Sequence, residues 1–208
     1  MKCQRGFTLI EMAIVLMIIG LLLGIFLIPF STKLTQQQNQ QTEQQLEAIQ
    51  EALFGFAIVK GRLPCPAKDV NGREDSTFCG QEGYLPWLNL GVEGYDAWGQ
   101  LFRYRADEQY TNAFLNPPTT SSELEVQDRQ SNLLTAFEDN TNPINERSRV
   151  IALIFSYGKD REANDKNKIL DNIYVQDVYI ENQFDDILIW LPKSLLINRL
   201  VVAGAWSS

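Results

Sequence analysis

Histidine is absent from all 208 residues of the sequence. Its absence removes the commonest general base and the commonest metal-ligating side chain, and it excludes Ser/His and Cys/His nucleophile systems. Schemes built on lysine or on carboxylates stay open, but no short motif points to one, and no glycine-rich phosphate loop occurs. The sequence therefore predicts a protein that is not an enzyme and that uses no cofactor.

Basic residues are few as well, because 18 Lys and Arg against 26 Asp and Glu give a formal net charge of −8. Nucleic-acid phosphates repel an acidic protein, so we expect no nucleic-acid partner. The length allows one anchoring helix and one head domain of about 150 residues.

Charged residues are almost missing from one long stretch, since between Phe7 and Phe30 only Glu11 carries a charge. A helix of this length would be roughly 36 Å long, enough to cross a hydrocarbon core of ~30 Å. Lys2 and Arg5 precede the stretch, which predicts a cytoplasmic N-terminus and a head outside the inner membrane, in the periplasm. The only good cleavage point lies before the apolar stretch, so the anchor would be retained.

Glu11 is unusual, because a carboxylate in a membrane helix costs about 2.5–3.5 kcal/mol on insertion scales. One interpretation is that its side chain extends to the lipid headgroups. The other begins with cleavage after Gly6, which makes the amine of Phe7 the new terminus, about one helical turn before Glu11. In subunits packed side by side, Glu11 of one would then neutralise the Phe7 amine of another, because two buried charges are acceptable as a pair.

The segment Gly6-Phe7-Thr8-Leu9-Ile10-Glu11, with its basic leader and apolar helix, resembles the processing site of type IV pilins and of the pseudopilins of type II secretion systems. The resemblance covers about the first fifty residues. It implies that a prepilin peptidase cuts between Gly6 and Phe7 and N-methylates Phe7. It also implies that Glu11 acts in assembly with other pilin or pseudopilin subunits.

Gly20, Gly24 and Pro29 weaken the apolar helix. They are either packing features of a helix in lipid or, as the resemblance implies, a region that can loosen on assembly. The glutamine-rich residues that follow are either a low-complexity linker or, as we prefer, more helix. An apolar stripe at Leu46, Ile49, Leu53 and Phe56 predicts that residues 31–60 are an amphipathic continuation, ending near Lys60-Gly61.

Cysteine is also rare. Cys3 belongs to the leader, which leaves Cys65 and Cys79 in a compartment where disulfides persist. We predict that they form a disulfide that closes a 15-residue loop, worth about 3 kcal/mol in the chain-entropy model. Two reduced thiols, or a metal site that is poor without histidine, are the alternatives.

Several segments of the head have strand patterns. Alternation of Phe102, Tyr104 and Ala106 with arginines predicts a half-buried strand, and the apolar run 150–155 predicts a central strand. Further strands are expected at 173–180 and 188–191, and a short helix after Pro192. Trp87 and Trp98 are interpreted as core residues. Residues 107–148 predict a polar surface insertion, with a short helix near 133–137.

One polar constellation follows the central strand. It begins with Ser156-Tyr157-Gly158-Lys159-Asp160 and continues to Asn164, Asp165, Asn167, Asp171 and Asn172, with Asp185 and Asp186 further on. Major pseudopilins bind calcium with a loop in roughly this place, and calcium needs six to eight oxygen ligands. Four basic residues stand among these side chains, so we favour a solvated polar turn and assign no metal.

Together these observations predict an α+β fold, with a long helix from Phe7 to about Val59 packed on a small antiparallel sheet. The expected divisions are a leader at 1–6, a membrane and filament-core helix at 7–30, its continuation at 31–60 and a head at 61–208. The resemblance implies a structural subunit of a type IV pilus or a secretion pseudopilus, anchored by a single pass in inner-membrane lipid before assembly. A monomeric membrane-anchored binding domain is the alternative.

Overall fold

The structure, a computed structural model, describes residues 8–113, 122, 124–135, 150–168, 171–181 and 183–205, and the backbone alone of residues 23–32. The chain divides into two units, Met1–Gln38 and Asn39–Ser208. Gly6 and Phe7, and with them the expected cleavage point, lie outside the described residues.

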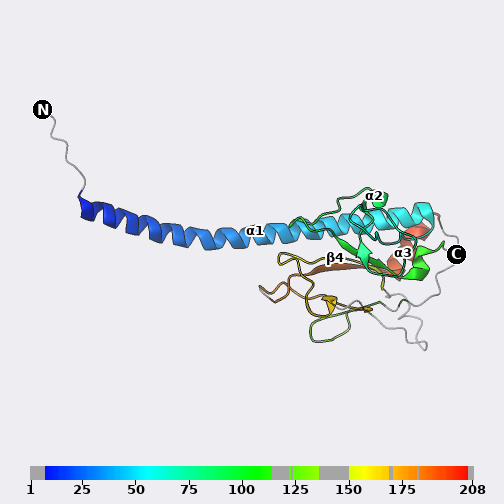
Figure 1. Cartoon of the computed structure of the whole chain (residues 1–208). Helices are drawn as coiled ribbons and strands as arrows, with labels where there is room; N and C mark the ends of the chain where they lie inside the picture. The colour runs from blue at the N-terminus through cyan, green and yellow to red at the C-terminus, as the bar shows by residue number, and fades with distance from the viewer. Residues whose placement is uncertain are drawn as a thin grey trace. The chain divides into compact units, whose positions relative to one another are not determined.

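Helix α1 spans Leu9–Lys60 and is the longest element (Figure 1). It includes the glutamine-rich residues. The helical interpretation of 31–60 is therefore confirmed, and the alternative interpretation as a low-complexity linker is wrong. The helix ends as expected at Gly61, whose positive φ of 65° suits glycine and whose N–H donates to the carbonyl of Ala57 at 2.8 Å.

Among the described residues, no helix is long and apolar enough to span a membrane. The span expected at 7–30 includes Phe7 and the side chains of 23–30, which are not described.

In the second unit, α1 buries one face. Leu46, Ile49 and Leu53 of the predicted stripe are 2% exposed or less, but the next turn buries Phe54 and Ala57 while Phe56 is half-buried. Burying a Leu or Ile side chain contributes about 1.5–3 kcal/mol, so this face fixes the helix on the head. The predicted stripe was therefore right for three of its four residues.

The helix packs on an antiparallel sheet of four strands in the order β1-β2-β4-β6. Their bounds are Gly83–Tyr84, Arg103–Ala106, Val150–Ser156 and Ile187–Pro192. Strand β4 is central and wholly buried, as its apolar run predicts, and β2 buries Tyr104 and Ala106 while its arginines are half-buried. Helix α3, Lys193–Val202, follows β6 directly and packs with α1 on the same face of the sheet (Figure 1).

A parallel pair of strands covers the other face. Strands β3, Glu125–Gln127, and β5, Ile173–Val175, pair in parallel, and Val126 and Tyr174 pack there against Leu153 and Phe155 of β4. The expected strand at 173–180 is therefore shorter than predicted. The short elements that remain are α2, Trp87–Leu90, and the 3-10 helices η1, Glu108–Thr111, and η3, Asp165–Lys168.

The polar surface insertion predicted at 107–148 has buried residues in its described part, since Leu124 and Val126 are 7% exposed or less. The short helix expected near 133–137 is not formed at Leu133, which bridges to Gln127 in extended backbone. Its last two residues lie outside the described residues. For Leu124 and Val126, packing against β4 outweighs the polar local composition.

Candidate functional site

The N-terminal motif begins helix α1 with a reciprocal pair of hydrogen bonds. The Glu11 N–H donates to Thr8 Oγ1 at 3.3 Å, and the Thr8 N–H donates to Glu11 Oε2 at 3.5 Å. This is the arrangement of a capping box, in which Thr at the N-cap and Glu three residues later satisfy two free backbone donors. Glu11 thus has a local structural role in the single chain, which the sequence analysis did not foresee although the Thr-x-x-Glu spacing was visible.

The apolar side chains that follow Glu11 are open to solvent in the isolated chain. From Leu9 to Leu22 the large ones are between 44% and 92% exposed. A large exposed apolar surface of this kind marks a site of interaction with another protein or with a membrane. The segment therefore requires lipid, neighbouring helices or both.

The disulfide expected in the head is present. Cys65 and Cys79 are bonded, with Cα atoms 4.7 Å apart. Arg62 holds the same loop by donating to both carboxylate oxygens of Glu74, at 2.8 and 2.9 Å, and this hydrogen bonding lowers the pKa of Glu74. The buried hydroxyl of Tyr104 donates to the carbonyl of Pro64 at 3.1 Å and so fixes the loop to strand β2.

A buried carboxylate, Glu82, joins this loop to the sheet. It accepts hydrogen bonds from Arg103 at 2.9 and 3.2 Å and from the hydroxyl of Tyr174 at 3.0 Å. The hydroxyl of Tyr157 donates to it at 3.4 Å, and burial together with the nearby carboxylate raises the pKa of Tyr157 to about 12. Every one of these groups is paired inside the protein, so the network is structural.

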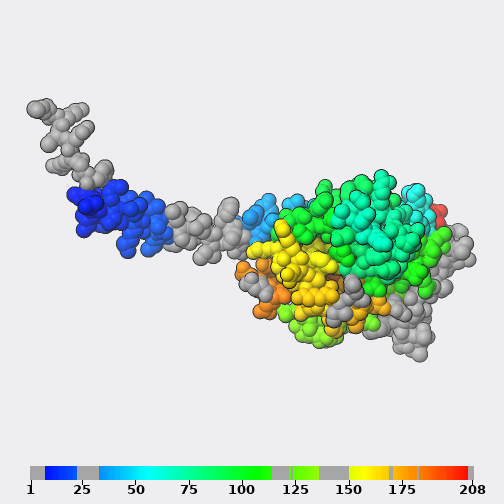
Figure 2. All heavy atoms as spheres, in the orientation of Figure 1, coloured from blue at the N-terminus to red at the C-terminus, as the bar shows by residue number. Residues whose placement is uncertain are grey.

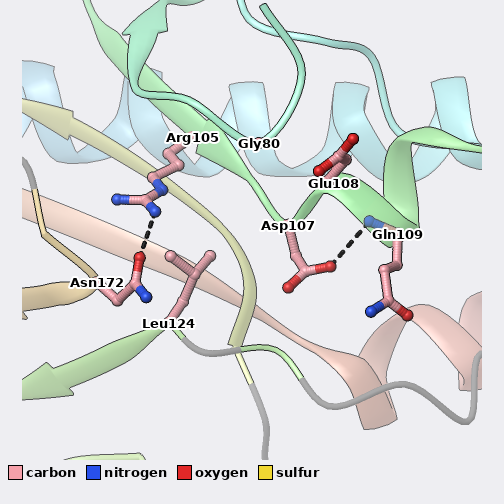
Figure 3. A pocket seen from close by; sticks show the side chains of 7 residues that line it. All are labelled: Gly80, Arg105, Asp107, Glu108, Gln109, Leu124 and Asn172. Atoms are coloured by element: carbon pink, nitrogen blue, oxygen red, sulfur yellow. Dashed lines mark hydrogen bonds between the residues drawn. The ribbon is translucent and has the colours of Figure 1, made fainter.

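A polar cleft of about 350 Å³ lies beside β2 and η1. Figure 3 shows the side chains that line it. The guanidinium of Arg105 points at Asn172 and donates to its side-chain oxygen, and it also donates to the hydroxyl of Tyr174 at 3.3 Å. Asp107 accepts from the backbone N–H of Gln109 at 3.0 Å and so caps η1. Arg105 and Asp107 are thus engaged by the chain itself, and the third charged side chain of the described lining is Glu108.

A second pocket, of about 330 Å³, lies where α1 passes the segments that leave β5 and enter β6. Its lining includes four carboxylates, those of Glu43, Asp177, Asp185 and Asp186, and no basic residue lines it among the described part of the chain. Asp186 is only 4% exposed, and its Oδ2 accepts from the Asn164 N–H at 2.9 Å and from Asn167 Nδ2 at 2.7 Å. Its buried Oδ1 has no partner.

The surroundings of Asp186 disfavour its charged form. Burial raises the pKa of Asp186 to about 7, and the negative charges of Asp185 and Asp160 act in the same direction. The two asparagine hydrogen bonds oppose this shift without cancelling it. Burial likewise raises the pKa of Asp185.

The polar constellation weighed for calcium is mostly occupied by bonds within the chain. Asp165 pairs with Arg129 at 2.9 Å, Asp171 accepts from the Ile173 N–H, and Asn167 binds strand β5 at Val175. Among the described residues, no group of three or more Cys, Asp and Glu side chains is placed to hold a metal ion. The constellation therefore connects η3, β5 and β6. In Figure 2 the yellow residues of this part of the chain lie beside the green residues of the head.

Comparison with known proteins adds one finding. Residues 1–27 match a family model described as the prokaryotic N-terminal methylation motif. This motif is the signature of type IV pilins and pseudopilins, so the resemblance drawn from the sequence is confirmed for the N-terminus. No curated protein and no solved structure matches the chain.

Proposed function

We propose that the protein is a structural, non-catalytic subunit of a type IV pilus or of a type II secretion pseudopilus. A prepilin peptidase removes residues 1–6 and methylates the amine of Phe7. The apolar residues 7–30 anchor the subunit in the inner membrane and later form the filament core, while the head at 61–208, in the periplasm, forms the outer surface. The observation that carries the proposal is the methylation motif at residues 1–27.

Two features of the structure support assembly into a filament rather than a monomeric state. The large apolar side chains from Leu9 to Leu22 have no partner in the single chain among the described residues. The same helix continues into the head, where Leu46, Ile49 and Leu53 fix it on the sheet. A subunit held this way presents its apolar helix to neighbours while its head stays folded.

Glu11 supplies the registration contact in this proposal. In the single chain its carboxylate only completes the capping box with Thr8. In the filament it would accept the charged amine of a neighbour's Phe7. Removing one partner of a buried ion pair costs about 3–5 kcal/mol, more than the ~1 kcal/mol of a helix cap, so loss of the pair should outweigh loss of the cap.

The experiment is the mass of the intact protein purified from native membranes, with sequencing of its N-terminal peptide. We expect a chain that begins at methylated Phe7. Gly6→Val should leave the leader attached, whereas the control Gly20→Val, where a Cβ meets open space, should be processed normally. Bulk protein that begins at Met1, or at an unmodified Phe7, would contradict the proposal and favour a monomeric anchored binding domain.

A further inference from the structure

Two residues that line the acidic pocket beside α1 have unsatisfied acceptors. Asp186 Oδ1 and Gln176 Oε1 are both buried without a hydrogen-bond partner, and both residues line the pocket. Buried polar groups in folded proteins are almost always paired, and an unpaired acceptor carries a cost of about 1–3 kcal/mol. A hydrogen-bond donor from outside the isolated chain would therefore stabilise these two oxygens.

The charge of the pocket defines the donor. Glu43, Asp177 and Asp185 line the same pocket as Asp186, and none of the described residues that line it is basic. Four carboxylates around one hollow attract a cation, because a neutral donor would satisfy the orphan oxygens but leave the repulsion between the carboxylates in place.

The shape and rim of the pocket favour an organic cation. Its volume of about 330 Å³ exceeds what one metal ion requires, and its described carboxylates are not clustered for metal coordination. Val178 and Tyr179, at 71% and 40% exposure, form an apolar part of its rim. Lys and Arg side chains combine a charged head with an apolar stem that packs on such a rim, and the five N–H donors of Arg can reach several acceptors at once.

We infer that this pocket receives the ammonium or guanidinium group of a basic side chain from a neighbouring subunit. The source of that side chain rests on the proposed function, since a filament places subunits side by side. A cation from a neighbour would pair the orphan oxygen of Asp186 and would offset the repulsion between acidic heads, because the chain carries a formal charge of −8 even before the leader with Lys2 and Arg5 is removed.

The first test measures binding by the full chain in detergent micelles, with ¹⁵N labelling and slightly alkaline buffer. The probe is N-acetyl-arginine amide, and its neutral isostere N-acetyl-citrulline amide is the matched control. We expect the arginine probe alone to shift the backbone amide resonances of Asp185 and Asn164 in a saturable way. Equal shifts with the citrulline probe, or no saturable shift with either, would overturn the inference, as would saturation by calcium chloride alone.

Two variants locate the binding. Asp186→Asn keeps the acceptor for the asparagine donors and should weaken arginine binding about tenfold or more, as loss of a buried charged hydrogen bond does. Glu43→Gln changes an exposed helix residue that cannot disturb folding, and it should weaken binding about threefold. Glu93→Gln, an equal charge change at an exposed residue outside the pocket, should have no effect. Unchanged affinity in both pocket variants contradicts the inference.

The second test concerns the source of the cation and uses the native host. Asp186→Asn should be inserted and processed normally but should enter filaments less efficiently than Glu93→Gln. If the chain binds the arginine probe yet the variant assembles normally, the neighbouring subunit is not the source. If wild-type chains form no filament while the probe still binds, the proposed function fails and the cation site stands.

Discussion

Asp186→Asn should stabilise the isolated protein above neutral pH, although it alters a buried residue. The native carboxyl has a pKa of about 7, against 3.8 for the ordinary group, mainly because it is buried. Between these values the native state keeps a proton that the unfolded chain has lost. Stability conferred by this proton is therefore present at low pH and is lost as pH rises from about 4 to about 7.

The magnitude follows from the shift. About three pKa units at 1.36 kcal/mol each correspond to a loss of up to about 4 kcal/mol across this window. Among the described residues, the titratable groups that interact with this carboxyl or line the pocket with it are Asp160, Asp185, Glu43, Asp177 and the hydroxyl of Tyr157, and none of these is cationic. Above about pH 7 the native carboxylate is charged and buried, and its Oδ1 has no hydrogen-bond partner.

An amide at this position retains an acceptor for Asn164 and Asn167 and has no charge to bury. Below about pH 4 the variant and the wild type should have the same free energy of unfolding. Above about pH 7 that of the variant should be higher by up to about 4 kcal/mol. The assay is urea unfolding of the full chain in detergent, followed by tryptophan fluorescence, at pH values on either side. Because the pKa of Asp185 is also raised, the difference between the two proteins isolates Asp186. A variant less stable than the wild type at alkaline pH would refute the reasoning.

Two further predictions concern the head. The double variant Cys65→Ala/Cys79→Ala should lose about 3 kcal/mol, the value for closing a loop of this length, and a wild-type urea midpoint without reductant would count against it. Glu82→Gln leaves Arg103 without its buried partner, so it should cost about 3 kcal/mol in the same unfolding experiment, with Glu93→Gln as the exposed control. Equal stability of the two glutamine variants would show that the Glu82 network contributes nothing.

The elements that the sequence predicted well are those with a long local pattern. Strand β4 is buried on both faces, so its sequence is a continuous apolar run. Strand β2 is fully buried on one face only, so its sequence alternates between apolar residues and arginines. The end of α1 at Gly61 followed from the left-handed backbone that glycine favours there.

The elements that were missed depend on distant partners. Strands β3 and β5 have three residues each, and their parallel pairing brings together segments almost fifty residues apart. No local pattern encodes such a pairing. Asp186 similarly resembled part of a solvated turn, because its burial is created by Asn164 and Asn167, which reach it from η3 and the turn before it.

Of the two candidate sites, the N-terminal motif could be predicted from the sequence and the acidic pocket could not. The motif around Glu11 combines a charge with a long apolar stretch, a contrast that stands out in any hydropathy pattern. The acidic pocket has no such signature, since its carboxylates come from α1 and from the segments that flank β5 and β6.

The most direct test of the account is the fate of Glu11→Gln in the native host. Glutamine can complete the same capping box with Thr8, so the variant keeps the helix start and removes only the charge. Membrane insertion should be at least as efficient, because a carboxylate costs about 2.5–3.5 kcal/mol there. Incorporation should be abolished or strongly reduced, because the Phe7 amine would lose a contact worth about 3–5 kcal/mol at every subunit.

The measurement compares membrane level, leader cleavage and presence in sheared or cross-linked filaments for Glu11→Gln, Glu11→Ala and the exposed control Glu47→Ala. We predict normal membrane levels for all three and loss of incorporation for the two Glu11 variants alone. Wild-type incorporation of Glu11→Gln would contradict the account, because it would show that assembly of this protein does not depend on the charge of Glu11.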